Sequence, residues 1–420
     1  MRLPSELDVL RLRDFRLVFG ASVASLVGDG VVPVALAFAV LDLTGSATDL
    51  GIVLAARVVA LVSSLLVGGV VGDRVGRRAV MVAADLVRLG AQAAIGVLLV
   101  SDDATIAEMF VSQALIGAAS GFFNPAASGL IPMVAGDRLQ QANTLKAMAM
   151  AAGNIVGPAI SGALVVATGP GAALLIDAAS YGISALLLAR VHVTAPAPAP
   201  RQRFGVELRE GFAEVRKRTW VWSIIACSAF WNMLAAFSVL GPVVAKDSLG
   251  GPAAWAAILA AEGIGWLAGG VALLRVTPRR PLVVASAASA VAVVPTVLLA
   301  VPAPLAVIVV AGLFAGVTSM LFNTLFETTL QRHIPRHALS RVSSYDWFGS
   351  LALQPIGLAL MGPLASAVGV SAALYLCAGL KLLTLCSLLA VKDIRTLGPF
   401  PEGPAAAAAS AELVNERAGA

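Results

Sequence analysis

Residues 69–78 read Gly-Val-Val-Gly-Asp-Arg-Val-Gly-Arg-Arg, a short polar stretch between two long apolar runs. Each run is close to the roughly 20 residues that a helix needs to cross the hydrocarbon core of a bilayer. Gly72 and Gly76 allow a tight turn between two such helices, and the arginines would lie among the lipid headgroups. Asp73 can pair with a helix N-terminus or with an arginine elsewhere in the chain. The stretch therefore indicates a loop that joins two membrane spans.

The composition of the whole chain supports a membrane protein. Of its 420 residues 59% are hydrophobic and only 13% are charged, and the mean hydropathy is +0.89. A soluble domain has about 25% charged residues, so this chain has too little polar surface to cover a soluble core. Apolar runs of helical length lie at 17–41, 50–71, 79–100, 105–128, 142–167, 172–190, 221–244, 253–274, 281–301, 305–328, 343–366 and 370–391. We therefore predict an all-α integral membrane protein with twelve transmembrane helices in two six-helix halves.

The distribution of basic residues predicts the orientation. With twelve spans, most of the 29 lysine and arginine residues fall on the side that carries both termini, and the loops of the other side hold only Lys246. The positive-inside rule then places both termini in the cytoplasm of a multi-pass protein of the cell membrane. The predicted domains are an N-terminal six-helix bundle at 1–190, a cytoplasmic linker at 191–220, a C-terminal six-helix bundle at 221–391 and a disordered cytoplasmic tail at 392–420.

The linker has two parts. Ala195–Pro200 alternates alanine and proline, which excludes a helix and indicates an extended spacer. Apolar residues then recur at helical spacing, with charged residues on the other face. These apolar residues are Phe204, Leu208, Phe212 and Val215. The pattern predicts a helix on the membrane surface that ties the two halves together or binds a regulatory partner.

Metal, nucleotide and nucleic-acid sites are not indicated. The three cysteines show no C-x-x-C spacing, and His333 and His337 flank Pro335, which spoils a helical metal pair. No Gly-Lys pair is present, so the chain has no P-loop. The basic residues are scattered rather than gathered with aromatic residues, unlike a nucleic-acid surface. We expect no cofactor, no metal, no nucleic-acid partner and no enzymatic activity.

The halves contain an internal repeat at a nearly constant offset. Matching residues are Gly117 with Gly316, Asn124 with Asn323, and Pro158 with Pro355. The loop after the second span also recurs after the eighth, with Leu274 in place of the aspartate. A duplicated membrane protein usually has its binding site between the repeats near the bilayer midplane, and we expect the same here.

Two motifs resemble those of the major facilitator superfamily. The stretch at 69–78 resembles the signature loop G-x-x-x-D-R-x-G-R-R/K between the second and third spans, which implies a conformational latch carried chiefly by Asp73. The residues that match are Gly69, Asp73, Arg74, Gly76, Arg77 and Arg78. In the fifth span, residues 153–162 resemble the antiporter motif G-x-x-x-G-P-x-x-G-G, with Ser161 in place of a glycine. Its matching residues are Gly153, Gly157, Pro158 and Gly162. In the fourth span, Gln113 stands where the family motif has an arginine.

A longer pattern resembles the drug:proton antiporter branch with macrolide-efflux-like and enterobactin-exporter-like proteins. It is carried by Phe15-Arg16, Ser25 to Asp29, Asp85 to Arg88, Asn124 to Pro132, Ala142-Asn143, Gly157-Pro158 and Asp177. The resemblance covers nearly the whole chain and implies two pseudo-symmetric halves. It also implies export of an amphipathic drug, macrolide or siderophore-like compound, driven by proton entry.

Ionisable residues within the spans are candidates for proton coupling, because a charge inside a bilayer is expensive. At 1.5 Å per residue, Asp29, Arg57 and Glu262 lie about 20 Å from the basic ends of their spans, near the midplane. Asp29 with Arg57 is the leading proton site, and a static bridge is the alternative. Glu262 has no basic partner at its level in its own span and is a second acid, a substrate contact or a permanently protonated side chain. We expect a structural role for Asp177.

Asp85 and Arg88 stand three residues apart on one helical face and are expected to pair with each other or to act as partners of the latch. Aromatic and amide residues predict an amphipathic substrate cavity, and they are Asn124, Trp231, Asn232, Asn323 and Phe326. Flat rings with a few amides suit a large planar or macrocyclic solute, and helix packing is the alternative role.

The leading hypothesis is a monomeric, proton-coupled secondary active exporter of a small molecule that works by alternating access. One alternative is a proton-coupled importer of a small metabolite, since the direction of transport rests on the resemblance. The other is a transport-inactive receptor or scaffold, which would have no need of acids such as Asp29 and Glu262 at mid-membrane depth.

Overall fold

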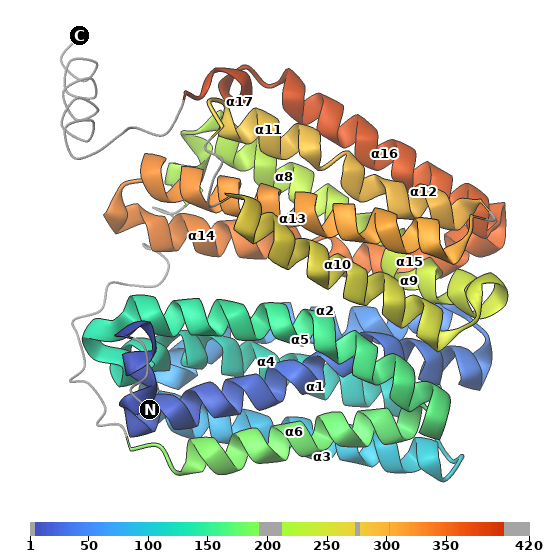
Figure 1. Ribbon diagram of the computed structural model, residues 1–420, viewed down its shortest axis with the longest axis horizontal. Coiled ribbons are helices and arrows are strands. Elements are labelled where there is room, and N and C mark those ends of the chain that lie inside the picture. Colours follow the sequence, from blue (N-terminus) through green and yellow to red (C-terminus); the bar gives the residue numbers. More distant parts are fainter. Residues whose placement is uncertain (1–4, 193–211, 274–277, 302, 399–420) are drawn as a thin grey trace.

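The computed structural model describes residues 5–192, 212–273, 278–301 and 303–398. These residues form helices joined by short turns, with no strand among them. Eleven stretches are long and apolar enough to cross a membrane, and one of them, 106–168, contains two helices of 30 residues each. The predicted all-α membrane fold with twelve spans is therefore confirmed, and its helices pack as two bundles (Figure 1).

The N-terminal half contains six uninterrupted helices. They are α1 (Arg13–Thr44), α2 (Ala47–Val75), α3 (Arg77–Val100), α4 (Ile106–Ala135), α5 (Leu139–Thr168) and α6 (Pro170–Ala189), preceded by the short helix η1 (Ser5–Arg11), with η2 (Gly136–Arg138) between α4 and α5. Helix α1 packs on α5 and α6, α2 packs on α4, and α3 packs on α4 and α6. Proline lies inside α1, α4 and α5 without ending them.

The C-terminal half differs because three of its six spans are interrupted. Its helices are α8 (Thr219–Met233), α9 (Ala236–Val244), η3 (Ala245–Leu249), α10 (Pro252–Leu273), α11 (Pro281–Ala288), η4 (Val291–Val293), α12 (Val294–Ala300), α13 (Leu305–His333), α14 (Arg336–Leu351), α15 (Gln354–Val368), α16 (Val370–Ala390) and α17 (Lys392–Thr396). The apolar runs at 221–244, 281–301 and 343–366 were expected as single helices. The first and third each form two helices, and the second forms α11, η4 and α12. Helices α12 and α15 begin with a proline in their first turn, where its missing N–H costs nothing.

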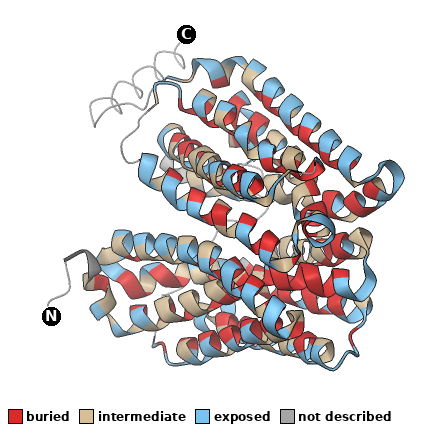
Figure 2. Cartoon of the chain, turned by 45° about the vertical axis from the view of Figure 1, so that its right-hand side comes forward, coloured by how far each residue is buried: buried red, intermediate tan, exposed pale blue. Residues whose placement is uncertain are grey.

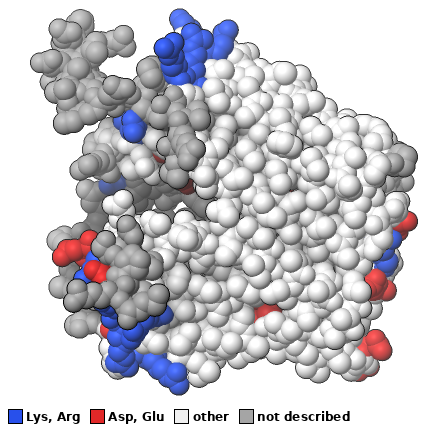
Figure 3. Space-filling view, in the orientation of Figure 1, with Lys and Arg blue, Asp and Glu red and all other residues white. Residues whose placement is uncertain are grey.

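The two ends of the molecule differ in charge. We call the end with η1, the α2–α3 turn and α17 the basic end, and the end with the α1–α2 turn and η3 the opposite end. Lysine and arginine gather at the basic end, and uncharged residues cover the wide belt between the two ends (Figure 3). Buried residues line the inside of each bundle, and many outward helix faces are exposed (Figure 2). This belt is apolar, as contact with lipid requires.

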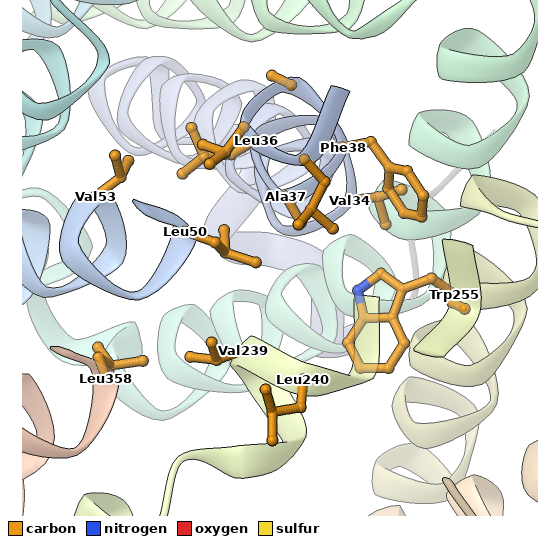
Figure 4. Close-up of a cluster of buried hydrophobic side chains, with 14 of the residues drawn as sticks. Val34, Leu36, Ala37, Phe38, Leu50, Val53, Val239, Leu240, Trp255 and Leu358 are labelled. Carbon is orange, nitrogen blue, oxygen red and sulfur yellow. The ribbon is translucent and has the colours of Figure 1, made fainter. Parts of the chain in front are cut away.

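At the opposite end the halves are joined by one apolar cluster (Figure 4). Residues of α1 and α2 such as Phe38 and Leu50 belong to the same cluster as Leu240 of α9, Trp255 of α10 and Leu358 of α15. Helices in a membrane are held together by close van der Waals packing, which this shared cluster provides between the halves at this end.

Two helix pairs extend this contact toward mid-depth, α5 with α10 and α2 with α15. Gly162 of α5 faces Ala256 of α10, and Gly51 of α2 faces the Leu358 carbonyl of α15, so side chains there would separate the helices.

At the basic end the apolar clusters stay within single halves. One cluster contains only residues 9–191, from the N-terminal half, and the other contains only residues 215–397, from the linker and the C-terminal half. Among the described residues, the apolar cluster that the two halves share therefore lies at the opposite end.

The pseudo-symmetry is visible in one pair of matching contacts. A side chain on Gly117 of α4 would collide with the backbone of Arg57 on α2, and one on Gly316 of α13 would collide with the backbone of Glu262 on α10. The repeated glycines thus serve the same close approach in both halves. Arg57 and Glu262 consequently occupy equivalent places.

The described part of the linker begins at residue 212, so Phe204, Leu208 and the Ala195–Pro200 spacer lie outside the described residues. Phe212 and Val215 lie in a helical segment. Val215 is buried against the C-terminal half, and the Phe212 ring lies 6.0 Å from that of Tyr345 on α14. Glu214 pairs with Lys217 at 2.6 Å and with Arg218 at 2.7 Å. This end of the linker is fixed to the C-terminal half.

Candidate functional site

A cavity of about 320 Å³ lies within the C-terminal half. Its lining residues are Cys227, Ser228, Trp231, Asn232, Ser289, Ala292, Ser319, Phe322, Asn323, Phe326, Glu327, Asp346, Trp347, Ser350, Leu351 and Leu385. All three helix interruptions border it, since α8, α11 and α14 end beside these residues. The main chain stays hydrogen-bonded at each interruption, because the Leu234, Ala290 and Ala352 N–H groups donate back to carbonyl groups at the ends of α8, α11 and α14.

Four of the five predicted cavity residues line this cavity, namely Trp231, Asn232, Asn323 and Phe326. The Asn232 amide donates to the Ser350 carbonyl at 3.0 Å, which ties α8 to the end of α14. The fifth residue, Asn124, lies exposed on α4 in the other half and is not part of this lining.

Two carboxylates on this cavity are absent from the predicted set. Glu327 follows Phe326 on α13, and Asp346 lies on α14, where Ser350 donates a hydrogen bond to it at 3.3 Å. Both acids stand close to arginines in the sequence, nearer the basic end than the midplane residues on which the sequence argument concentrated. The sequence signal that could have identified Glu327 and Asp346 is that each is an acidic residue inside a predicted apolar span.

A second polar group lies in the N-terminal half. The Arg57 guanidinium lies 3.1 Å from Oδ1 of Asp29, and the Tyr181 hydroxyl of α6 donates to the same oxygen at 2.8 Å. Ser25 lies one helical turn before Asp29 and donates to its Oδ2 at 3.4 Å. The side chains of Asp29 and Arg57 are 33% and 26% exposed, so this ion pair is accessible. The pairing expected from matching depth is present, and Tyr181 is an additional member.

The polar group continues into the core between α3, α4 and α6. Asp85 and Arg88 form an ion pair on one face of α3, and Ser184 donates to Asp85 at 2.6 Å. The Arg88 guanidinium also lies 4.1 Å from the centre of the Phe123 ring and 4.6 Å from that of Tyr181. Side-chain exposure of the ion pair is only 4% for Arg88 and 0% for Asp85, in contrast to the accessible pair at Asp29.

Asp177 of α6 has a comparable enclosed setting. Gln92 of α3 donates to it at 2.9 Å, and Ser180 donates at 3.4 Å. Gln113 of α4, the residue in place of the family arginine, donates to Gln92 at 3.5 Å. These side chains are fully or almost fully buried and join three helices.

Glu262 of α10 has its electrostatic partner on another helix. Its carboxylate interacts with the charge of Lys381 on α16. The Lys381 ammonium lies 4.7 Å from the centre of the Trp231 ring. The two residues lie on α10 and α16, more than one hundred positions apart in the sequence, so spacing within one span does not indicate the link.

The predicted latch loop forms the turn between α2 and α3. Gly76 has a φ of 104°, which favours glycine, and it joins the two helices directly. Arg77 donates to the Gly129 carbonyl of α4, and Arg78 donates to the last carbonyls of α6, Leu188 at 3.1 Å and Ala189. Cations at a helix C-terminus stabilise it.

Other latch residues contribute less to the described contacts. Arg74 is exposed near the end of α2, where Gly69 also lies. The Asp73 side chain lies outside the described part of the structure.

The antiporter-motif residues place α5 between two partners. Gly153 faces Leu26 of α1 and Gly157 faces Gly30, while Ser161 donates to the Val31 carbonyl at 2.7 Å. Gly162 faces α10 of the other half, and Pro158 is buried inside α5. The motif therefore packs one helix against its own half and against the other half. Among the described residues, no three His, Cys, Asp or Glu side chains are grouped so that they could hold a metal ion.

Twelve spans in two halves, with a cavity of mixed polar and aromatic lining inside one half, are the arrangement of a membrane transporter. The chain belongs to the Major Facilitator Superfamily, whose family model matches residues 17–353. The resemblance expected from the motifs is thereby confirmed.

Similar proteins include efflux pumps and exporters. The multidrug efflux pump Tap of Mycolicibacterium fortuitum is 28% identical over 388 residues, covering 88% of this chain and 93% of Tap. The enterobactin exporter EntS of Salmonella typhimurium is 26% identical over 400 residues, covering 92% of this chain and 94% of EntS.

Among solved structures, the nucleoside transporter NupG has the same fold. It gives a TM-score of 0.73 at 14% identity, covering 90% of this chain and 98% of the other. A bacterial homologue of the human lysosomal transporter Spinster, solved inward-facing and unoccupied, gives 0.73 at 12% identity, covering 96% and 100%.

Proposed function

We propose that the protein is a proton-coupled secondary active exporter of an amphipathic organic compound that works by alternating access. The class of compound is a drug, a macrolide or a siderophore-like molecule. The proposed site is the plasma membrane with both termini cytoplasmic, because the positive-inside rule assigns the basic end to the cytoplasm. A single chain contains both halves and the cavity, which supports a monomer as the working unit.

The observation that carries the proposal is a cavity with aromatic and amide lining in a molecule whose halves share an apolar cluster at the opposite end and have separate clusters at the basic end. Trp231 and Phe326 offer apolar ring faces, and Asn232 and Asn323 offer amides, as an amphipathic solute needs. The opposite end is closed by the shared apolar cluster and by Lys246, whose ammonium contacts Asp42 at 2.7 Å. With the basic end in the cytoplasm, this is the state that would accept a compound for export.

The accessible ion pair supports proton coupling. Burial in a medium of low dielectric favours the neutral form of a carboxylic acid, whereas a nearby arginine favours the charged form. Protonation of Asp29 would remove its attraction to Arg57 and free the oxygen that both Arg57 and Tyr181 contact. Three helices, α1, α2 and α6, meet at this carboxylate, so a single proton would change contacts among all three.

The loop arginines support a latch. Arg77 and Arg78 fix the α2–α3 turn to α4 and α6, so the turn moves with its own half as a unit. Gly162 provides the contact of α5 with α10 that must change when the halves rotate against each other. Export is the direction supported by the relatives, since those named above are an efflux pump and an exporter.

The proposal is tested in an efflux-deficient bacterial host by accumulation of dyes, macrolides and siderophores. Cells with the wild-type protein should accumulate less of at least one compound, and a protonophore should abolish the difference. The Asp29→Asn variant should behave like protonophore-treated cells, and Asp103→Asn, in an exposed loop of the same half, should behave like wild type. Raised accumulation with the wild type would instead identify an importer.

A further inference from the structure

We infer that the cavity in the C-terminal half selects organic cations, with Glu327 and Asp346 matching the positive charge and the aromatic residues holding the apolar body. This inference rests on the proposed transport function and adds the charge of the substrate. Glu327 lies on α13 and Asp346 on α14, and both side chains line the same cavity. None of the lining residues is a lysine, an arginine or a histidine. The lining therefore carries negative formal charge alone.

The two acids differ from those of the N-terminal half in their partners. Asp29 pairs with Arg57 and Asp85 pairs with Arg88, so those carboxylates are already compensated. Glu327 and Asp346 form no ion pair among the described residues, and Asp346 accepts only the weak bond from Ser350. Both carboxylates line the same cavity, from α13 and α14. Two like charges in one cavity are relieved by a cation placed between them.

One buried cation, Lys381, lies beside a ring of the cavity lining but is not part of that lining. Lys381 is absent from the lining, and its ammonium lies 4.7 Å from the centre of the Trp231 ring, where its charge interacts with Glu262. An ammonium over a ring uses the negative face of that ring. A bound cation is therefore expected at the carboxylates, with its hydrocarbon part against Trp231 and Phe322.

The aromatic residues give the cavity an apolar surface in addition to its two carboxylates. Phe322 and Phe326 stack with ring centres 6.1 Å apart, and Trp231 and Trp347 complete the apolar lining. A volume of about 320 Å³ is at the lower end of the range for pockets that hold a small organic molecule. The chemistry matches a rigid, aromatic or branched cation and disfavours an anionic compound such as a catecholate siderophore.

Tetraphenylphosphonium and tetraphenylborate provide the sharpest test, because they have the same shape and opposite charge. Equilibrium binding of radiolabelled tetraphenylphosphonium to the purified full-length protein should be displaced by unlabelled tetraphenylphosphonium and not by tetraphenylborate. Glu327→Gln and Asp346→Asn should each weaken binding about tenfold, the loss expected when one screened charge contact is removed. Asp103→Asn should leave the affinity unchanged.

Two results would overturn the cation site. One is equal displacement by the two ions, and the other is unchanged affinity in the Glu327→Gln, Asp346→Asn double variant with an unaltered melting temperature. Failure of the transport proposal is recognised separately. The purified protein could bind cations selectively through both acids and yet move no compound uphill in vesicles with a proton gradient. That result would support the cation site and contradict the proposed export function.

Discussion

The ammonium of Lys246 lies 2.7 Å from the carboxylate of Asp42 and 2.7 Å from the carbonyl oxygen of Leu41. This contact ties the end of α1 to η3 and thereby joins the two halves at the end where they are closed. Lys246 is also the lone basic residue expected in the loops of that side. A residue that stands out in the charge distribution therefore closes one end of the transporter.

Loss of this contact should favour opening at that end. The side chains are 35% and 52% exposed, so the pair stabilises the closed arrangement by only about 0.2–1 kcal/mol. We expect Asp42→Asn to shift the population toward the opposite-end-open state by roughly 1.5–5-fold. Spin labels at Asp103→Cys and Asp247→Cys, with the native cysteines replaced, would report the change as a longer distance. The charge swap Asp42→Lys with Lys246→Asp should restore the shorter distance, and an unchanged distance in Asp42→Asn would contradict a gate.

Neutralisation of Asp29 should uncouple transport from the proton gradient. Asp29→Asn retains the size of the side chain and the hydrogen bond from Tyr181, so the protein should fold with a wild-type melting temperature. In vesicles we expect loss of uphill transport and retention of downhill exchange. Asp29→Glu, which keeps a titratable group, should retain part of the uphill rate. Uphill transport at the wild-type rate by Asp29→Asn would exclude this residue.

The buried pair of Asp85 and Arg88 should matter for stability. Replacing Asp85 alone with leucine leaves the Arg88 charge buried beside Phe123 and Tyr181, and breaking a buried pair costs about 3–5 kcal/mol. Thermal unfolding in detergent should show a large loss for Asp85→Leu. The double variant Asp85→Leu, Arg88→Met should recover most of it. A single variant as stable as the wild type would show that the pair is not needed for the fold.

The glycines of the antiporter motif should separate into two classes. Gly157→Val forces α5 away from Gly30 within the N-terminal half and should lower the melting temperature. Gly162→Val meets Ala256 across the two halves and should alter the spin-label distance at the opposite end with a smaller loss of stability. Ser161→Ala removes one buried hydrogen bond and should cost about 0.5–1.5 kcal/mol. Equal effects of both valine variants on both measurements would refute the distinction.

The end of the linker should loosen in acid. Hydrogen bonds from Arg218 and Lys217 lower the pKa of Glu214 below its ordinary value of 4.5. A lowered pKa in the folded state means that the contribution to stability is complete above about 4.5 and is lost as the pH falls through the folded-state value. Hydrogen exchange of residues 212–218 should therefore rise below pH 4.5 relative to the rest of the protein. Glu214→Gln should show the fast exchange at every pH, and an unchanged acid dependence in that variant would assign the effect to another group.

The twelve spans were predictable because hydropathy and helix length dominate the free energy of a chain in a bilayer. The interruptions of α8–α9, α11–α12 and α14–α15 were not, because proline gives no reliable signal there. Pro33 and Pro158 lie inside uninterrupted helices, and no proline lies between α8 and α9. Whether a helix breaks depends on the neighbours that accept the freed backbone groups, which the sequence does not specify.

The contacts of the candidate site could be predicted where two residues lie at the same depth in the membrane on consecutive spans. Asp29 and Arg57 could be paired because both lie near the midplane on consecutive spans. The link between Glu262 and Lys381 required knowledge of which helices touch. Tyr181 carries no formal charge and gave no signal in an apolar run, although its hydroxyl is essential to the geometry at Asp29.

The interrupted helices around the cavity also bear on how the protein can change under selection. Side chains of the lining such as Glu327 can be exchanged by single mutations, whereas the interruptions are held by main-chain hydrogen bonds that every residue type except proline can make. Variants selected for a new substrate range are therefore expected to differ in the side chains of the lining and to keep all three interruptions.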